Sequence, residues 1–194
     1  KSFKTRNTDF WDWSLDEVAL FDLPAMVDKV LSQHARGMRC IVIGFSQGSA
    51  ELMASLSLLP ELNDKIGLAV GLAAMTRPSF ATTGPSIISS IIHGPPQLLY
   101  LFFGRKMMLS SVLFWMEALP PQMYVQMIDF FLALLFGWDC KNIDVSDRRH
   151  MYTKLYSYSS VKSISHWFQM ARTGRFQMYD ESANANLSRR QGHV

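Results

Sequence analysis

The chain has 194 residues, of which 48% are hydrophobic and 18% charged, so it can bury a sizeable core in one domain and is not disordered. Its net charge of +3 is too small to indicate nucleic-acid binding, and no basic stripe with stacking aromatic residues appears. Two cysteines, Cys40 and Cys140, do not decide the redox compartment, and no Cys/His spacing is typical of a metal site. Because the chain begins with Lys1, we expect it to be a piece of a longer protein, whose targeting signals it cannot show.

The first part of the chain predicts helices followed by a strand. Residues 14–17 have the pattern of a capping box, so a helical turn should begin at its serine. Asp22 is expected to cap a second helix over residues 24–33, which Gly37 ends. A short apolar run rich in β-branched residues follows at 39–44 and predicts a buried strand.

That strand leads directly into Gly44, Ser46 and Gly48, which form the pattern Gly-x-Ser-x-Gly before a helix-like segment. This context is typical of a nucleophile elbow, in which the serine hydroxyl points into a cleft. The sharp turn is expected to bring backbone too close for side chains at both glycines. The N–H of Gln47, at the start of the helix, would lie near a developing oxyanion. The alternative is an ordinary strand-to-helix turn with a capping serine.

A second apolar run over residues 65–72 predicts the next strand. Residues 1–76 would then contain one βαβ unit whose parallel strands are buried on both faces. From residue 77 to 173 no clear strand appears, and apolar helical segments alternate with Pro and Gly. The segment at 123–136 is shorter than the roughly 20 residues that a membrane span needs. We therefore expect a helical insertion that covers the edge of the sheet.

Eight short motifs then occur in one order along the chain. They are FWDWSLDE at 10–17, DLPA at 22–25, GFSQG at 44–48, LFFGR at 101–105, GWDCKNI at 137–143, SVKS at 160–163, HWFQ at 166–169 and FQMYD at 176–180. With these motifs the chain resembles the acid-lipase branch of the α/β-hydrolases, and most closely the fungal steryl ester hydrolases.

The resemblance implies an α/β-hydrolase fold with a Ser–Asp–His triad and neither metal nor organic cofactor. Ser46 matches the nucleophile of the family, and Gln47 would supply one N–H of the oxyanion hole. Residues 1–76 would be a partial core, residues 77–180 a helical cap or lid, and residues 181–194 a polar tail. The triad Asp and His, and the second oxyanion donor, would lie outside this chain, so the chain alone is expected to be inactive.

The expected function of the intact protein is serine ester hydrolysis of neutral lipids in lipid catabolism, with steryl esters as substrates. The resemblance also implies attachment to a lipid droplet or membrane through an anchor that this chain does not contain. A triacylglycerol lipase and a catalytically inactive lipid-surface protein are the alternatives.

Other polar residues receive plainer interpretations. His166 is expected to pack within the cap. Asp129 is expected to be exposed or in a capping position, with a buried acid as the alternative. The Phe- and Met-rich segments at 98–103 and 123–136 are compatible with a lipid-binding tunnel or with plain cap core. None of the histidines is expected to act as the base of a triad: they are His34, His93, His150, His166 and His193.

Overall fold

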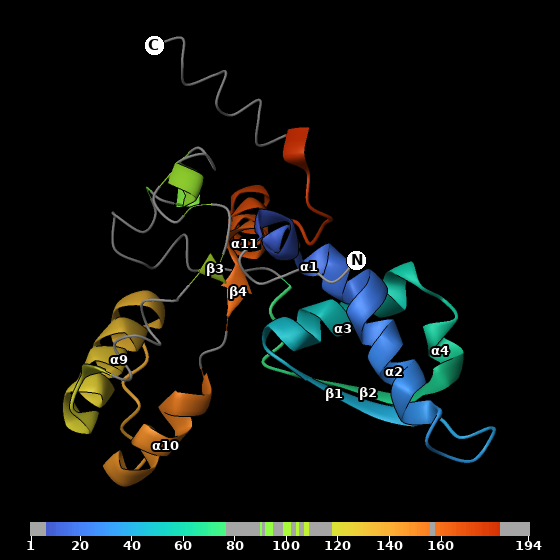
Figure 1. Ribbon diagram of the computed structural model, residues 1–194, viewed down its shortest axis with the longest axis horizontal. Helices are drawn as coiled ribbons and strands as arrows, with labels where there is room; N and C mark the ends of the chain where they lie inside the picture. The colour runs from blue at the N-terminus through green and yellow to red at the C-terminus, as the bar shows by residue number, and fades with distance from the viewer. Residues whose placement is uncertain are drawn as a thin grey trace.

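The computed structural model of the chain describes residues 7–76, 90, 92–94, 99–101, 104, 107–108, 118–155 and 158–182. Its helices and strands are, in order, η1 (Thr8–Trp11), α1 (Leu15–Glu17), η2 (Val18–Asp22), α2 (Leu23–Leu31), β1 (Cys40–Phe45), α3 (Gln47–Leu58), α4 (Leu62–Lys65), β2 (Ile66–Leu72), β3 (Met107–Met108), α9 (Pro121–Phe136), α10 (Val145–Leu155), β4 (Ser159–Ser160) and α11 (Val161–Thr173). Figure 1 shows α1–α4 with β1 and β2 on one side, α9 and α10 on the other, and α11 between the two groups.

The capping box at the first helix is confirmed. The Ser14 side chain accepts a hydrogen bond from the Asp16 N–H at 3.1 Å, and the Glu17 carboxylate accepts one from the Ser14 N–H at 2.6 Å. The expected cap at Asp22 is wrong, because its side chain makes no capping bond. The helix runs on from α1 through the π-helical turn η2 into α2, so no helix begins at Asp22 and no free N–H is left there to cap.

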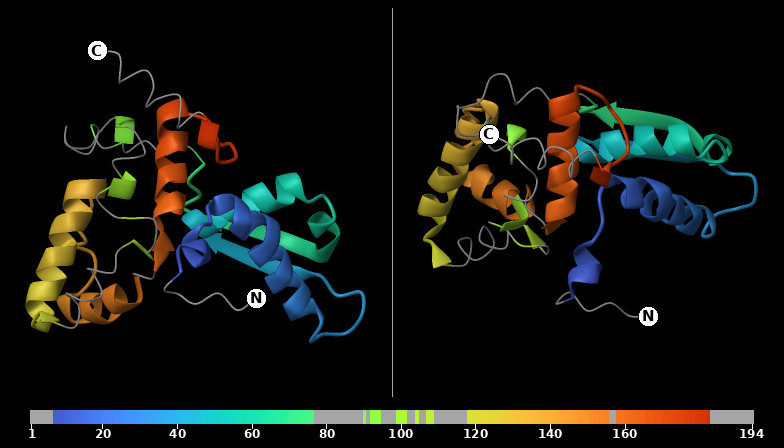
Figure 2. Two further views of the ribbon diagram at one scale, coloured as in Figure 1. Left: turned by 45° about the horizontal axis from the view of Figure 1, so that its top comes forward. Right: turned by 90° about the horizontal axis from the view of Figure 1, so that it is seen from above.

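A parallel pair of strands forms the predicted βαβ unit. β1 pairs with β2 in the register Ile41↔Leu68 to Phe45↔Leu72, and α3 connects them. Figures 1 and 2 show α2 and α3 on the same face of this pair. The core between α2, α3, α4 and the sheet consists of Val27, Leu52, Leu62 and Ile66, with Cys40 and Val42 packed against it.

The prediction that these strands are buried on both faces is wrong for the structure as described. Ile41, Ile43 and Phe45 of β1 are exposed, as are Leu68 and Leu72 of β2. Successive side chains of a strand point to opposite faces, so helices on one face leave the other set of residues uncovered. The apolar runs thus marked the strands correctly, although only one face is packed.

The prediction that no strand follows residue 77 is also wrong. The two-residue strands β3 and β4 form an antiparallel pair, in which Met107 pairs with Ser160. Ser160 also caps α11, because its side chain accepts a hydrogen bond from the Ser163 N–H at 2.9 Å. Pairs this short leave no alternation in the sequence to detect.

α11 packs on the N-terminal unit, although it lies within the segment expected to form a cap. Trp167 and Met170 of α11 share a buried cluster with Leu15 of α1 and Ala50 of α3. Behind the helix, the Tyr179 N–H donates to the Asp16 carboxylate at 2.8 Å. The last part of the described chain is therefore anchored to the first.

α9 and α10 form a second packed group. Their buried residues are Tyr124, Val125, Ile128, Leu132 and Tyr152. Asp129 is neither exposed nor a cap, which corrects the expectation: it is half-buried and accepts hydrogen bonds from Arg148, at 2.9 Å, and from the Tyr152 hydroxyl. Burial first, and then this bond, raises the pKa of Tyr152. In the part of the chain that the structure describes, no helix is long and apolar enough to cross a membrane.

Replacing Asp129 by Ala should weaken the contact between α9 and α10. The change removes the carboxylate that accepts from the half-buried Arg148 and from the buried Tyr152 hydroxyl, which typically costs about 1–3 kcal/mol. Urea unfolding followed by circular dichroism measures the loss. Asp139→Ala is the matched control, because Asp139 pairs with Lys141 in solvent and should give no measurable change. Equal effects of the two variants would contradict the structural role of Asp129.

Candidate active site

Ser46 occupies a strained backbone turn between β1 and α3. Its backbone angles, φ 50° and ψ −112°, lie in a region of the Ramachandran map that residues with a Cβ rarely occupy. The Ser46 N–H donates to the Leu72 carbonyl at 2.9 Å, which ties the turn to the end of β2. Such strain persists only where the surrounding structure enforces it, and it is compatible with the strained strand-to-helix turn of a nucleophile elbow.

The two glycines of the motif differ in their surroundings. A Cβ on Gly44 would lie 2.6 Å from the carbonyl oxygen of Gly48 and 2.8 Å from the Cα of Ser49, so only glycine fits there. A Cβ on Gly48 would meet no described atom within 4 Å. The prediction that close backbone leaves no room for a side chain is therefore confirmed at Gly44. It is wrong at Gly48, where space is open among the described residues.

The first turn of α3 leaves a donor beside the serine. The Ser46 carbonyl accepts from the N–H groups of Ser49, at 3.1 Å, and Ala50, at 3.3 Å. Among the described residues, nothing accepts a hydrogen bond from the Gln47 N–H. The Ser49 hydroxyl lies 2.7 Å from the Gly44 carbonyl and 3.0 Å from that of Leu72, and holds the helix against both strand ends. The open N–H is thus available to a negatively charged oxygen near Ser46.

No described histidine contacts the Ser46 hydroxyl. His34 Nδ1 lies 2.8 Å from the Val30 carbonyl in the loop after α2. The buried His166 has Nε2 2.8 Å from the Gln177 carbonyl, and its Nδ1 makes no hydrogen bond and lies 4.0 Å from Asp16. His193 lies outside the described residues. His166 is therefore a packing histidine as expected, but it packs between the segment after α11, at Gln177 and Tyr179, and Asp16 of α1.

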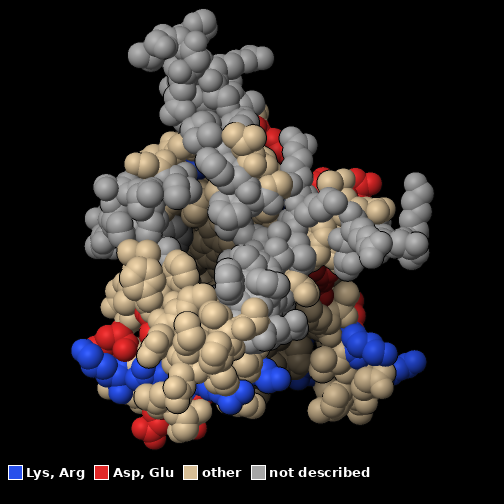
Figure 3. Space-filling model, turned by 60° about the vertical axis from the view of Figure 1, so that its left-hand side comes forward, with Lys and Arg blue, Asp and Glu red and all other residues tan. Residues whose placement is uncertain are grey.

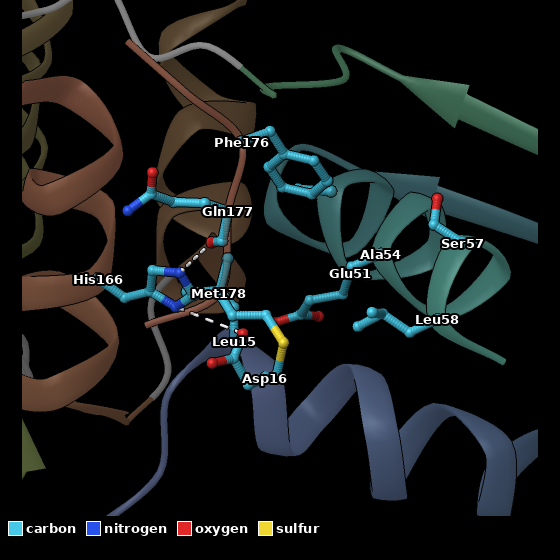
Figure 4. Close-up of a pocket in the computed structure, with 11 residues that line it drawn as sticks. Leu15, Asp16, Glu51, Ala54, Ser57, Leu58, His166, Phe176, Gln177 and Met178 are labelled. Atoms are coloured by element: carbon cyan, nitrogen blue, oxygen red, sulfur yellow. Dashed lines mark hydrogen bonds and ion pairs between the residues drawn. The ribbon is translucent and has the colours of Figure 1, made fainter. Parts of the chain in front are cut away.

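A cavity of about 240 Å³ lies between α1, α3, α11 and the segment after α11. Figure 4 shows Asp16, Glu51 and His166 reaching toward it from three elements. Most of its remaining wall is apolar, including Leu58, Phe176 and Met178. Ser46 is not among the residues that line it, so this cavity is separate from the elbow.

Glu51 is the polar residue near the elbow that the sequence did not single out. It is only 8% exposed, and its burial raises its pKa to about 7. A hydrogen bond from Gln47 at 2.8 Å opposes this rise, and the negative charge of Asp22 adds to it. Its spacing in the sequence could have indicated that it contacts Gln47, because residues four apart lie on the same side of a helix.

The described residues contain no group of three His, Cys, Asp or Glu side chains that could hold a metal ion. The expectation that the protein uses neither metal nor organic cofactor stays a prediction.

Replacing Gly44 by Ala should destabilise the protein by about 1–3 kcal/mol, because the new methyl group collides with backbone that cannot move freely. Thermal unfolding followed by circular dichroism is the measurement. Gly48→Ala is the matched control, since it adds the same methyl group where space is open. It should be neutral or stabilising by up to about 1 kcal/mol, as alanine favours helix. A Gly44→Ala protein as stable as the control would show that the turn is not crowded.

Comparison with known proteins gives relatives but no family model that matches the chain. A probable lipase from Schizosaccharomyces pombe is 41% identical over 182 residues, which cover 93% of this chain and 40% of the relative. Human gastric triacylglycerol lipase is 26% identical over 178 residues, or 90% of this chain and 44% of the relative. A relative from Crotalus adamanteus, whose name joins lysosomal acid lipase and cholesteryl ester hydrolase, is 28% identical over 183 residues, or 92% of this chain and 45% of the relative.

The chain thus spans less than half the length of these relatives. Lipase relatives imply an α/β-hydrolase fold, and the parallel β1–β2 pair connected by α3 is consistent with part of its core. The chain is similar to these proteins, whose names include lipase, along at least nine tenths of its own length.

Proposed function

We propose that the protein carrying this chain is a serine ester hydrolase that acts on neutral lipids, with steryl esters as its main substrates. Ser46 is the nucleophile, and the Gln47 N–H is one donor of the oxyanion hole. The observation that carries the proposal is the strained backbone of Ser46, with a positive φ of 50°, at a strand-to-helix junction. An ordinary capping serine has extended backbone and a side chain bonded to its helix, whereas Ser46 makes no such bond.

The reaction follows from this geometry. The Ser46 hydroxyl oxygen attacks the ester carbonyl while a base takes its proton, and the Gln47 N–H stabilises the oxyanion of the tetrahedral intermediate. The carbon–oxygen bond to the alcohol then breaks, and the alcohol leaves with the proton from the base. Water, activated by the same base, hydrolyses the acyl-serine and releases the fatty acid.

The base is expected outside the described residues. A serine hydroxyl is a poor nucleophile at neutral pH without an adjacent base, and no described histidine reaches Ser46. We propose that the triad Asp and His belong to the part of the protein that corresponds to the remaining length of the relatives. On this proposal the 194-residue chain by itself does not turn over esters.

In the protein expressed from the full reading frame, a fluorophosphonate probe should label Ser46, because a base-activated serine attacks its phosphorus. Mass spectrometry of the labelled peptide identifies the site. Ser46→Ala should remove the label and lower turnover of cholesteryl oleate on the order of 10⁶-fold.

Ser57→Ala is the control, since Ser57 lies on the same helix and its hydroxyl donates to the Met53 carbonyl one turn earlier. Label that persists in Ser46→Ala would refute the assignment. If the 194-residue chain hydrolyses p-nitrophenyl butyrate and its Ser46→Ala variant does not, the base lies within the chain.

Two other functions remain candidates. The name of the human relative includes triacylglycerol, which favours a triacylglycerol lipase, and parallel assays with triolein and cholesteryl oleate separate the two. A catalytically inactive lipid-surface protein would leave Ser46 unlabelled and still bind lipid.

The helices that follow β2 are proposed to form a cap, within residues 77–180, that meets a lipid droplet or membrane surface. The support comes from α9, where Met123, Phe130, Phe131 and Leu134 are exposed. In Figure 3, the side of the molecule that carries α9 and α10 has its Lys, Arg, Asp and Glu residues mainly along the lower margin. An exposed apolar patch beside a charged rim is typical of a surface that contacts lipid.

The protein should float with phospholipid-coated neutral-lipid droplets at both low and high salt, because apolar burial is not screened. Phe130→Gln combined with Phe131→Gln should abolish flotation, as it removes side chains that are 62% and 44% exposed. Phe21→Gln is the control, because Phe21 is 67% exposed on η2 instead. Flotation that survives the double change, or that Phe21→Gln abolishes equally, would contradict the role of α9.

A further inference from the structure

The carboxamide of Gln47 joins two helices that are far apart in the sequence. Its oxygen accepts a hydrogen bond from the indole N–H of Trp167 on α11 at 2.9 Å. Its nitrogen donates to Glu51, one turn further along α3, at 2.8 Å. The carboxamide is therefore held at both ends, by a residue 120 positions away and by a neighbour on its own helix.

The chemistry of the partners fixes which end faces which helix. An indole N–H can only donate, so the carboxamide must present its oxygen to Trp167. Its NH₂ group then faces Glu51, which has an acceptor oxygen whether or not it is protonated. Reversing the amide would set two donors against each other at Trp167, so the arrangement has one stable orientation.

This restraint acts at the peptide that defines the elbow. Gln47 is the first residue of α3 and directly follows Ser46, whose backbone angles are strained. A strained turn keeps its geometry only where neighbouring contacts over-determine it, and the pinned Gln47 side chain is such a contact. The backbone N–H of the same residue makes no hydrogen bond with the described residues, so its direction depends on how that residue is held.

We propose that Trp167 and Glu51 are positioning residues, which hold Gln47 so that its backbone N–H faces the oxyanion formed at Ser46. The proposal rests on the function proposed above. It also gives α11 a role in the reaction without contact with substrate, since the Trp167 indole is linked to the elbow through its hydrogen bond to the Gln47 side chain. Trp167 is itself buried beside Leu15, Ala50 and Met170, which fixes the position of the donor.

The charge of Glu51 tunes this restraint. The negative charge of Asp22 on η2 repels that of Glu51, and the Gln47 carboxamide donates to Glu51. Asp16 of α1 and His166 of α11 line the same cavity as Glu51. Burial raises the pKa of Glu51 to about 7. Below that pH the carboxyl is neutral, and above it the bond from Gln47 becomes charge-assisted and stronger. The restraint should therefore tighten as the pH rises through 7.

Spectroscopy tests the coupling without reference to catalysis. In ¹⁵N–¹H spectra, the indole N–H signal of Trp167 is assigned as the one that disappears in Trp167→Phe. That signal should shift with pH, with a midpoint near 7, and the shift should disappear in Glu51→Gln, which keeps an acceptor but does not titrate. An indole signal insensitive to pH, or equally sensitive in Glu51→Gln, would overturn the tuning by Glu51.

Kinetics tests the positioning. Trp167→Phe and Glu51→Leu, which each remove one partner of Gln47, should lower kcat for cholesteryl oleate about 10- to 100-fold with KM unchanged. Glu51→Gln should restore kcat because it still accepts the bond from Gln47, and it should remove the part of the pH profile due to Glu51. Trp11→Phe is the matched control, since Trp11 is similarly buried but packs on Phe10 and Tyr158.

The outcomes separate the two proposals. If fluorophosphonate labels Ser46 equally fast in the native protein, Trp167→Phe and Glu51→Leu, the positioning role is refuted and the hydrolase stands. If Ser46 is never labelled while the Trp167 signal still titrates through Glu51, the hydrolase is refuted and the network is structural only. A fall in kcat for Trp11→Phe as large as that for Trp167→Phe would also refute positioning.

Discussion

The close approach of α3 to the end of β1 is the constraint on which the candidate site depends. At Gly44 the backbone of the following helix lies so near that a single methyl group has no room. This contact requires a sharp turn between β1 and α3, in which Ser46 adopts a strained backbone with a positive φ of 50°. The hydroxyl of Ser49 holds the approach from the helix side through the carbonyls of both strands. The proposed roles of the Ser46 hydroxyl and the Gln47 N–H both depend on the geometry of this short segment of backbone.

α11 and the segment behind it give the N-terminal unit support that its own sheet does not supply. A parallel pair of two strands has few hydrogen bonds and one uncovered face, which makes it marginal alone. The structure adds Ser160, whose hydroxyl donates to the Trp13 carbonyl, the indole bond from Trp167 to Gln47, and the bond from the Tyr179 N–H to Asp16. These contacts tie the helix before the sheet and the helix after the serine to one common partner.

The sequence predicted the local features well, because local chemistry determines them. The capping box at Ser14 needs only its own four residues, and the strand and helix around Ser46 follow from apolar periodicity. The features it missed depend on tertiary neighbours. Whether β1 is covered on one face or two depends on which elements pack there, and a half-buried Asp129 depends on Arg148 of the next helix. Glu51 received no prediction, since nothing local indicates its burial.

The indole bond between α11 and the elbow also bears on the order in which the site can form. Gln47 leaves the ribosome 120 residues before Trp167, so β1 and α3 are complete long before their distant partner exists. Closing a loop of that length costs chain entropy that only the later packing of α11 offsets. In a nascent chain the elbow is therefore held by its local contacts alone. Its final geometry arises late in synthesis, after the segment between the two helices has been made.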